Sequence, residues 1–111
     1  MTKAKFQIFV GTDNQFYFRL LAANGENILA SEGYTSRSGC VNGIDSVRSN
    51  ATDDGRYQRE VSSDGQFYFN LTARNGEVIG SSETYISEAN RENGIEAVKN
   101  SAPDALIEDV T

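Results

Sequence analysis

Two short motifs place the same potentially reactive side chains in both halves of the sequence. A serine is followed by Glu32 and Tyr34 in the first half, and the same spacing recurs with Glu83 and Tyr85 in the second. A carboxylate beside a phenol could line a polar site at the start of a helix. The alternative is structural: each tyrosine packs beneath the helix, while the glutamate satisfies unpaired amides in its first turn.

The rest of the chemical inventory is small. The chain has no histidine and one cysteine, Cys40. It therefore lacks histidine-based triads and the usual zinc ligand sets. Cys40 lies on an apolar helical stripe without a histidine to activate it, which favours a core residue over a nucleophile. We expect no catalytic residue, no metal and no cofactor.

The two motifs belong to a tandem repeat. Residues 15–51 align without a gap with residues 66–102, and about half of the aligned positions are identical, which marks a true internal repeat. Each half is near the size at which a separate hydrophobic core becomes marginal. We therefore predict a single domain, residues 1–111, in which repeat 1 (1–52) and repeat 2 (57–111) share one core.

Alternating hydrophobic residues predict three strands in each repeat. The expected strands cover residues 5–10, 16–22 and 27–31, then 57–61, 67–73 and 78–82. Asn24-Gly25 and Asn75-Gly76 separate the second and third strands of each repeat. Such pairs are typical of type I′ hairpin turns, in which both central residues have positive φ.

A helix follows the strands of each repeat. Ser36 and Ser87 are the expected N-caps, because a serine oxygen can accept from an unpaired amide in the first turn. An internal glycine, Gly43 or Gly94, costs each helix about 1 kcal/mol relative to alanine, which predicts close approach of helix and sheet. With a last strand within 106–110, the prediction is an α+β fold: a tandem pseudo-two-fold repeat of βββα units, with an antiparallel sheet and two helices on one face.

Three motifs recur in tandem with this pattern: F-Y-F-x-L-x-A-x-N-G-E-x-I, S-E-x-Y and N-G-I-[DE]-[SA]-V-[RK]. In this combination the chain resembles the YegP-like family of small bacterial proteins over nearly its whole length. The resemblance implies a two-repeat α+β fold and carries no established activity, cofactor or catalytic residue. The repeats differ at Cys40 and Val41, which become Arg91 and Glu92, and at Leu29, which becomes Gly80.

The outward side of the central strands is a second candidate site. Strand alternation places Tyr17 and Arg19 opposite the buried phenylalanines, with Tyr68 and Arg74 in the other repeat and Phe9 on a neighbouring strand. Tyrosine and arginine concentrate at interface hot spots, so these five residues form a candidate interaction face. Two alternatives stay open: ordinary cross-strand pairing, or cover by the other repeat.

Charge and composition narrow the partners. The formal net charge is −6, from 10 basic and 16 acidic residues, which argues against nucleic acid and anionic membranes. No apolar run approaches the roughly 18 residues of a membrane span. We expect no signal peptide at the N-terminus, and the single cysteine favours the cytoplasm.

Three function classes are compatible with these features. The leading hypothesis is a non-catalytic binding or interaction module, for a protein partner, a small polar ligand or self-association. The alternative is a structural or stress-related accessory protein without a defined ligand. An enzyme has the least support, because it would work with Asp, Glu, Tyr and Lys alone.

Overall fold

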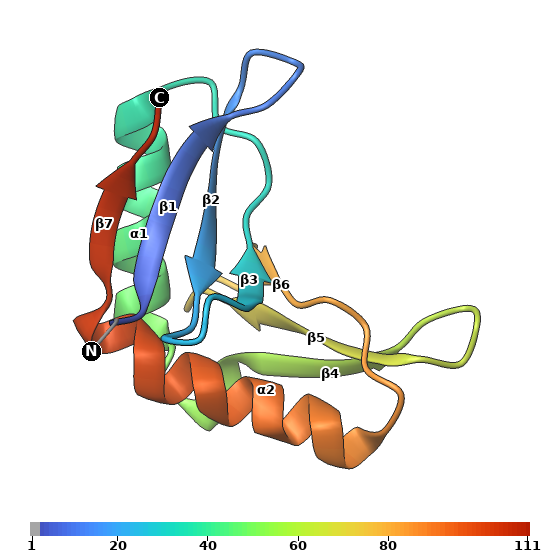
Figure 1. Cartoon of the computed structure of the whole chain (residues 1–111). Coiled ribbons are helices and arrows are strands. Elements are labelled where there is room, and N and C mark those ends of the chain that lie inside the picture. Colours follow the sequence, from blue (N-terminus) through green and yellow to red (C-terminus); the bar gives the residue numbers. More distant parts are fainter. Residues whose placement is uncertain (1–2) are drawn as a thin grey trace.

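The computed structural model describes residues 3–111, which form a sheet and two long helices (Figure 1). The strands are β1 (Lys5–Val10), β2 (Phe16–Leu21), β3 (Asn27–Ala30), β4 (Tyr57–Val61), β5 (Phe67–Thr72), β6 (Val78–Ser81) and β7 (Leu106–Asp109). The helices are α1 (Arg37–Asn50) and α2 (Glu88–Ser101), followed by the 3₁₀ turns η1 (Asp54–Arg56) and η2 (Ala102–Asp104). The predicted α+β repeat is confirmed.

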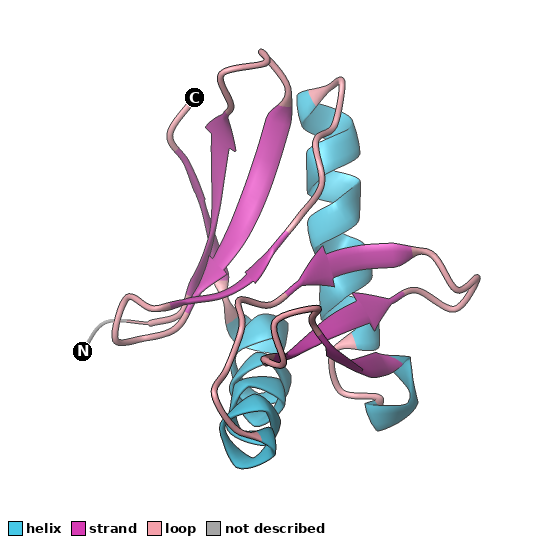
Figure 2. Ribbon diagram, turned by 90° about the vertical axis from the view of Figure 1, so that its right-hand side faces the viewer, coloured by secondary structure: helices cyan, strands magenta, loops and turns pink. Residues whose placement is uncertain are grey.

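All seven strands belong to one sheet, in the order β4-β5-β6-β3-β2-β1-β7. We call β3, β2, β1 and β7 the first half-sheet, and β6, β5 and β4 the second half-sheet. The two half-sheets meet where Ala30 of β3 pairs with Ser81 of β6, and their strands run in clearly different directions (Figure 2). Strand β7 pairs in parallel with β1, so the sheet is mixed and not wholly antiparallel as predicted.

The hairpin turns differ in type from the prediction. In the first of the two Asn-Gly turns, the Gly25 amide donates to the Ala22 carbonyl at 2.8 Å. Gly25 has a positive φ, 87°, whereas Asn24 does not. This is a type I turn followed by a left-handed residue, because type I′ would also need a positive φ at Asn24. The Asn24 side chain instead accepts a hydrogen bond from the Glu26 amide at 3.0 Å. In the other three hairpin turns, the residue with the left-handed backbone conformation is Asn14, Gly65 or Gly76.

Both helices begin as predicted. The Ser36 and Ser87 hydroxyls accept hydrogen bonds from the amides three residues later, at 3.0 and 3.1 Å. Each helix has 14 residues. Within residues 3–111, neither helix is long and apolar enough to cross a bilayer.

The internal glycines have the packing role that the sequence indicates. A Cβ atom on Gly43 would lie 2.7 Å from Cζ of Tyr34, and one on Gly94 would lie 2.7 Å from Cζ of Tyr85. Real Cβ atoms do not approach other atoms so closely, so each helix can lie on its tyrosine only because the glycine has no side chain.

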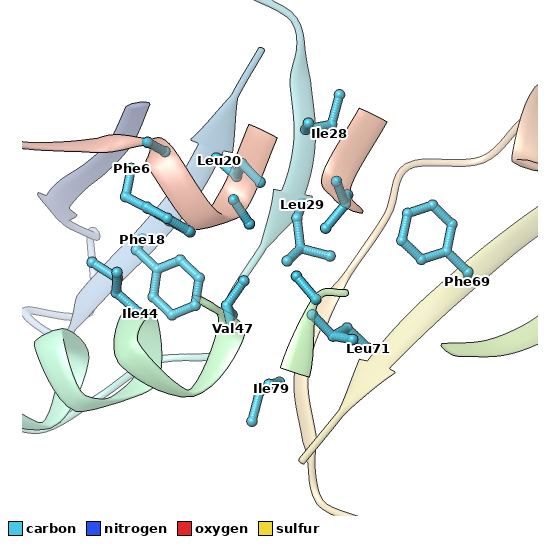
Figure 3. Packing of buried hydrophobic residues seen from close by; sticks show 14 of the residues in the cluster. Phe6, Phe18, Leu20, Ile28, Leu29, Ile44, Val47, Phe69, Leu71 and Ile79 are labelled. Carbon is cyan, nitrogen blue, oxygen red and sulfur yellow. The ribbon is translucent and has the colours of Figure 1, made fainter. Parts of the chain in front are cut away.

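One hydrophobic core runs through both half-sheets (Figure 3). Phe18 and Phe69 are its equivalent fully buried aromatic residues, and Leu29 lies between them. A Cβ atom on Gly80, the counterpart of Leu29, would lie 2.7 Å from Leu29 Cγ. The space near the pseudo-two-fold axis therefore holds the side chain of Leu29 alone, because Gly80, its counterpart in the second repeat, has no side chain.

Candidate functional site

The outer face of the first half-sheet brings three predicted residues together. The rings of Phe9 on β1 and Tyr17 on β2 stack with centroids 5.6 Å apart and planes 17° from parallel. The Arg19 guanidinium carbon lies 4.6 Å from the centroid of Phe9. All three residues are partly exposed, so they lie on the surface and the other repeat does not cover them.

Hydrogen bonds hold this arrangement in place. Arg19 Nε donates to Gln7 Oε1 at 2.7 Å, and Gln7 Nε2 donates to Glu108 Oε1 at 2.8 Å. Lys5 Nζ lies 3.0 Å from the other oxygen of Glu108. The guanidinium is therefore fixed over Phe9 by a line of polar contacts that reaches β7.

Asp13 anchors the opposite end of the stack. The Tyr17 hydroxyl donates to Asp13 Oδ2 at 2.6 Å. This bond lowers the pKa of Asp13 and raises the pKa of Tyr17. An open hollow of about 360 Å³ lies here, and its lining includes Phe9, Asp13 and Tyr17. We call Phe9, Tyr17 and Arg19 the aromatic face.

Sequence reasoning missed the polar residues of this site. Alternation along β1 could have indicated Lys5 and Gln7, because both lie on the same side of the strand as Phe9. No local signal could have indicated Glu108, since it reaches the face through pairing between chain segments far apart in sequence.

The second half-sheet does not repeat the aromatic face. Tyr68 is partly exposed and lies opposite Glu60 of β4, the position that Phe9 holds in the first repeat. Arg74 lies in the turn after β5, because that strand ends at Thr72 and the predicted alternation stops there. The structure therefore brings together the residues of the first repeat, and does not place Arg74 on the strand face.

The other candidate site, with the glutamate and tyrosine motifs, has Glu32 and Tyr34 in the first repeat and Glu83 and Tyr85 in the second. The Tyr34 ring stacks on Phe18 with centroids 6.2 Å apart, and burial raises the pKa of Tyr34. Tyr85 packs in the same way on Phe69, at 6.5 Å, and burial also raises its pKa. The tyrosines therefore pack under the helices, as in the structural alternative.

The two glutamates do not have the structural role proposed for them. Glu32 and Glu83 are exposed, and the helix amides are capped by serines. Within residues 3–111, neither glutamate side chain forms a hydrogen bond or an ion pair.

Cys40 and the acidic residues offer little reactive chemistry. The Cys40 side chain is fully buried, and burial raises the pKa of its thiol to about 11. Among residues 3–111, no group of three histidine, cysteine or acidic side chains is arranged to hold a metal ion.

The fold and the repeat also appear in known proteins. A family described as a domain of unknown function, DUF1508, matches the chain twice, over residues 12–58 and 62–109. This chain belongs to the DUF1508 family. It is 53% identical, over 95% of both chains, to the UPF0339 protein in ptx operon 5'region of Stutzerimonas stutzeri. It is 46% identical, over 96% of both, to the UPF0339 protein YegP of Escherichia coli.

Two solution NMR structures of relatives have the same fold. YegP from E. coli, described as a protein of unknown function, superposes with a TM-score of 0.94 at 44% identity, covering 100% of this chain and 96% of its own. The UPF0339 protein SO3888 from Shewanella oneidensis has a TM-score of 0.92 at 42% identity, covering 99% and 93%. The expected resemblance to YegP-like proteins is confirmed.

Each DUF1508 match covers most of one repeat. Each match begins in or next to a turn, continues through two strands and a helix, and reaches into the strand that follows. In the sheet, β1 and β4 are the equivalent strands, because each pairs antiparallel with the strand that follows it, and β7 is an additional strand beside β1.

Proposed function

We propose that this DUF1508 protein is a non-catalytic binding module whose contact surface is the aromatic face. The observation that carries the proposal is the fixed stack of Phe9, Tyr17 and Arg19 on an uncovered side of the sheet. Aromatic and arginine side chains are enriched where binding energy concentrates in interfaces. Side chains already held in place lose less conformational entropy when a partner binds.

The shape of the site favours a macromolecular partner. The hollow beside Tyr17 is open to solvent and does not enclose a ligand-sized space. Small-molecule sites usually enclose most of their ligand, whereas protein interfaces are broad and shallow. A protein partner fits this surface better than a small polar ligand does.

The titratable groups support a role without catalysis. Where hydrogen bonds and ion pairs shift the pKa of a carboxylate, as in Asp13, Asp54, Asp64, Glu108 and Asp109, the shift is downward. A general acid at neutral pH would need a raised pKa. Cys40 is buried with a raised pKa, so it is a poor nucleophile.

Two further parts of the proposal rest on charge and cysteine chemistry. The net charge of −6 disfavours nucleic-acid and anionic-membrane partners. A single buried thiol is compatible with the reducing cytoplasm, where we place the protein.

A pair of matched double variants tests the contact surface. Tyr17→Ala with Arg19→Ala removes most of the aromatic face, and Tyr68→Ala with Asn70→Ala removes the aligned residues of the second half-sheet. Proteins captured by the wild type from a bacterial lysate serve only as candidates. Each candidate partner is then purified and titrated calorimetrically against the wild type and against both double variants.

The first-half variant should weaken binding by about tenfold or more, because truncating hot-spot residues costs more than about 1 kcal/mol each. The second-half variant should stay close to the wild type. Equal losses in both variants, or full binding by the first-half variant, would contradict the proposal. If no purified candidate binds the wild type, the accessory-protein alternative is favoured.

A further inference from the structure

A second hollow lies between the two repeats, away from the aromatic face. It has a volume of about 410 Å³ and lies between α2 and the turn that joins β2 to β3. In Figure 1 this turn is seen next to α2, and β3 contacts that helix. The walls therefore come from both repeats, which makes the hollow a product of the tandem fold.

Four polar side chains line this hollow without partners in the protein. Glu26 comes from the β2–β3 turn, Tyr85 from the segment before α2, and Asn90 and Asn93 from α2. Within residues 3–111, none of these four side chains forms a hydrogen bond or an ion pair. By contrast, the hydroxyls of Tyr17 and Tyr57 donate to protein oxygens at 2.6 and 2.7 Å.

The two asparagines make α2 less stable than alanines at the same positions would. Asparagine is less favourable than alanine within a helix by up to about 0.7 kcal/mol. Asn90, Asn93 and Ala97 occur at spacings that share one helix face, and all three line the hollow. A ligand contact would give these amides a role that helix formation does not.

The charged groups that line the hollow favour a positively charged ligand. Among residues 3–111, the only ionisable groups that line it are those of Glu26 and Tyr85, and no lysine or arginine does so. After burial, the largest effects on Tyr85 come from Glu83 and Glu26, and both raise its pKa. The site is therefore negative, and its oxygen atoms can accept hydrogen bonds from a positively charged donor.

The apolar part of the lining suits a short carbon chain. Ile28 and Ala97 contribute apolar side chains, and the Tyr85 ring packs closely against Gly94. We propose that this hollow binds a primary ammonium group carried on a short alkyl chain, with Glu26, Tyr85 and the asparagine amides around the ammonium. The inference is independent of the proposed function, because the aromatic face contributes no residue to it.

Three probes of similar size separate charge from shape: n-butylammonium chloride, n-butanol and sodium butyrate. Each is titrated into the full chain at about 150 mM salt, which screens general attraction to the acidic surface. Amide chemical shifts are followed by NMR. We expect saturable shifts in residues 90–97 with n-butylammonium alone, with an affinity in the millimolar range typical of a small ligand.

The repeat supplies matched controls. Glu26→Gln should weaken n-butylammonium binding by about fivefold, because a charge-assisted contact is lost. Tyr85→Phe should weaken it by a smaller factor. The aligned changes Glu77→Gln and Tyr34→Phe should leave it within about twofold.

Several results would overturn the inference. These are equal binding of n-butanol, wild-type affinity in Glu26→Gln, and shifts that rise without saturation across the acidic surface. Glu26→Gln and Tyr85→Phe alter side chains that line the hollow. The NMR spectra of these two variants and of the two controls report directly whether each one is folded.

Discussion

The two outer edges of the sheet are closed by different means. At the first edge, β7 lies along β1, and Phe6 and Ile8 of β1 are completely buried. Asp109 at the end of β7 forms an ion pair with Arg37 of α1. A fourth strand therefore covers the core of the first half-sheet.

At the second edge, no strand from the described residues 3–111 lies beyond β4, and arginines cover the core instead. Arg59 of β4 aligns with Ile8 of β1, and Arg91 of α2 aligns with Cys40 of α1. The Arg59 guanidinium contacts both oxygens of Glu92, at 2.9 and 3.0 Å. Arginine can cover apolar surface with its stem while its charged end stays paired, so these side chains shield the core and blunt the open edge of β4.

The comparison shows how a tandem repeat becomes asymmetric. Strands β1 and β4 hold equivalent places beside β2 and β5, but β7 lies along β1 and, among residues 3–111, no strand lies along the outer side of β4. Substitutions at equivalent positions then compensate for the missing strand. The aromatic face belongs to the same asymmetry, because Glu108 of β7 completes its polar contacts.

The largest effect is expected at the pseudo-two-fold axis, where Leu29 and Gly80 compete for one space. Leu29→Ala should lower the free energy of unfolding by about 3 kcal/mol through a cavity. Gly80→Ala should lower it by about 2 kcal/mol, because the new methyl group would contact Leu29 Cγ. In the double variant the second penalty should largely disappear, since the shortened residue 29 leaves room. Equilibrium denaturation in urea measures all three, and strictly additive losses would contradict the shared space.

Removing Arg91 should expose the core of the second half-sheet. Its guanidinium lies 5.4 Å from the centroid of Phe67 and donates to the Glu60 carbonyl at 3.2 Å. Arg91→Ala should cost about 2 kcal/mol, since both the charged hydrogen bond and the packing of the stem are lost. Arg91→Met should recover part of this loss by keeping an apolar stem. Thermal and urea unfolding measure the difference, and an Arg91→Ala variant as stable as the wild type would show that the edge needs no cover.

Arg59→Ile makes the β4 edge resemble that of β1. The wild-type side chain is 31% exposed and also contacts Asp54 Oδ1 at 3.0 Å. An isoleucine would leave an apolar strand edge without an inward charge to block pairing, so self-association should increase with little change in the fold. Sedimentation velocity over a concentration series measures this, with Arg59→Gln as the polar control. Equal association of the two variants would mean that the charge does not protect the edge.

Local signals in the sequence predicted most of the fold. Ser36 and Ser87 cap their helices, and Gly43 and Gly94 admit the tyrosines, because caps and close contacts depend on residues near in sequence or repeated in it. The parallel partner of β1 could not be predicted, since Lys5 and Glu108 lie far apart in the chain.

The candidate site was predictable to the extent that strand alternation was correct. Phe9, Tyr17 and Arg19 share one face because β1 and β2 are regular where these residues lie. The same reasoning misplaced Arg74, because nothing in the alternating pattern marks where β5 ends. The predicted turn type was wrong for a similar reason. The Asn24 side chain accepts a hydrogen bond from the Glu26 amide within the turn, and the Asn-Gly pair alone does not reveal this option.

The smallest expected effect compares the ionic contacts of the two edges. Asp109 accepts hydrogen bonds from Thr111 and pairs with Arg37, which lowers the pKa of Asp109 to about 2. Asp54, in the η1 turn that precedes β4, accepts hydrogen bonds from Lys99 and Arg59, which also lower its pKa. A carboxyl group with a lowered folded-state pKa stabilises the fold above its unfolded-state pKa, and this stabilisation is lost as pH falls through the folded-state value.

Asp109→Asn and Asp54→Asn should therefore be slightly less stable than the wild type at neutral pH, with the difference shrinking as pH falls from about 4 toward 2. Both carboxylates are exposed, so salt should weaken the effect as well. Urea midpoints across this pH range measure it. Asp104→Asn is the control, because that carboxylate forms no hydrogen bond or ion pair within residues 3–111. A difference that stays constant down to pH 2 would mean that packing, and not charge, accounts for it. If only Asp109→Asn depends on pH, the ionic contribution belongs to the edge closed by β7, and the arginines at the other edge act through their apolar stems.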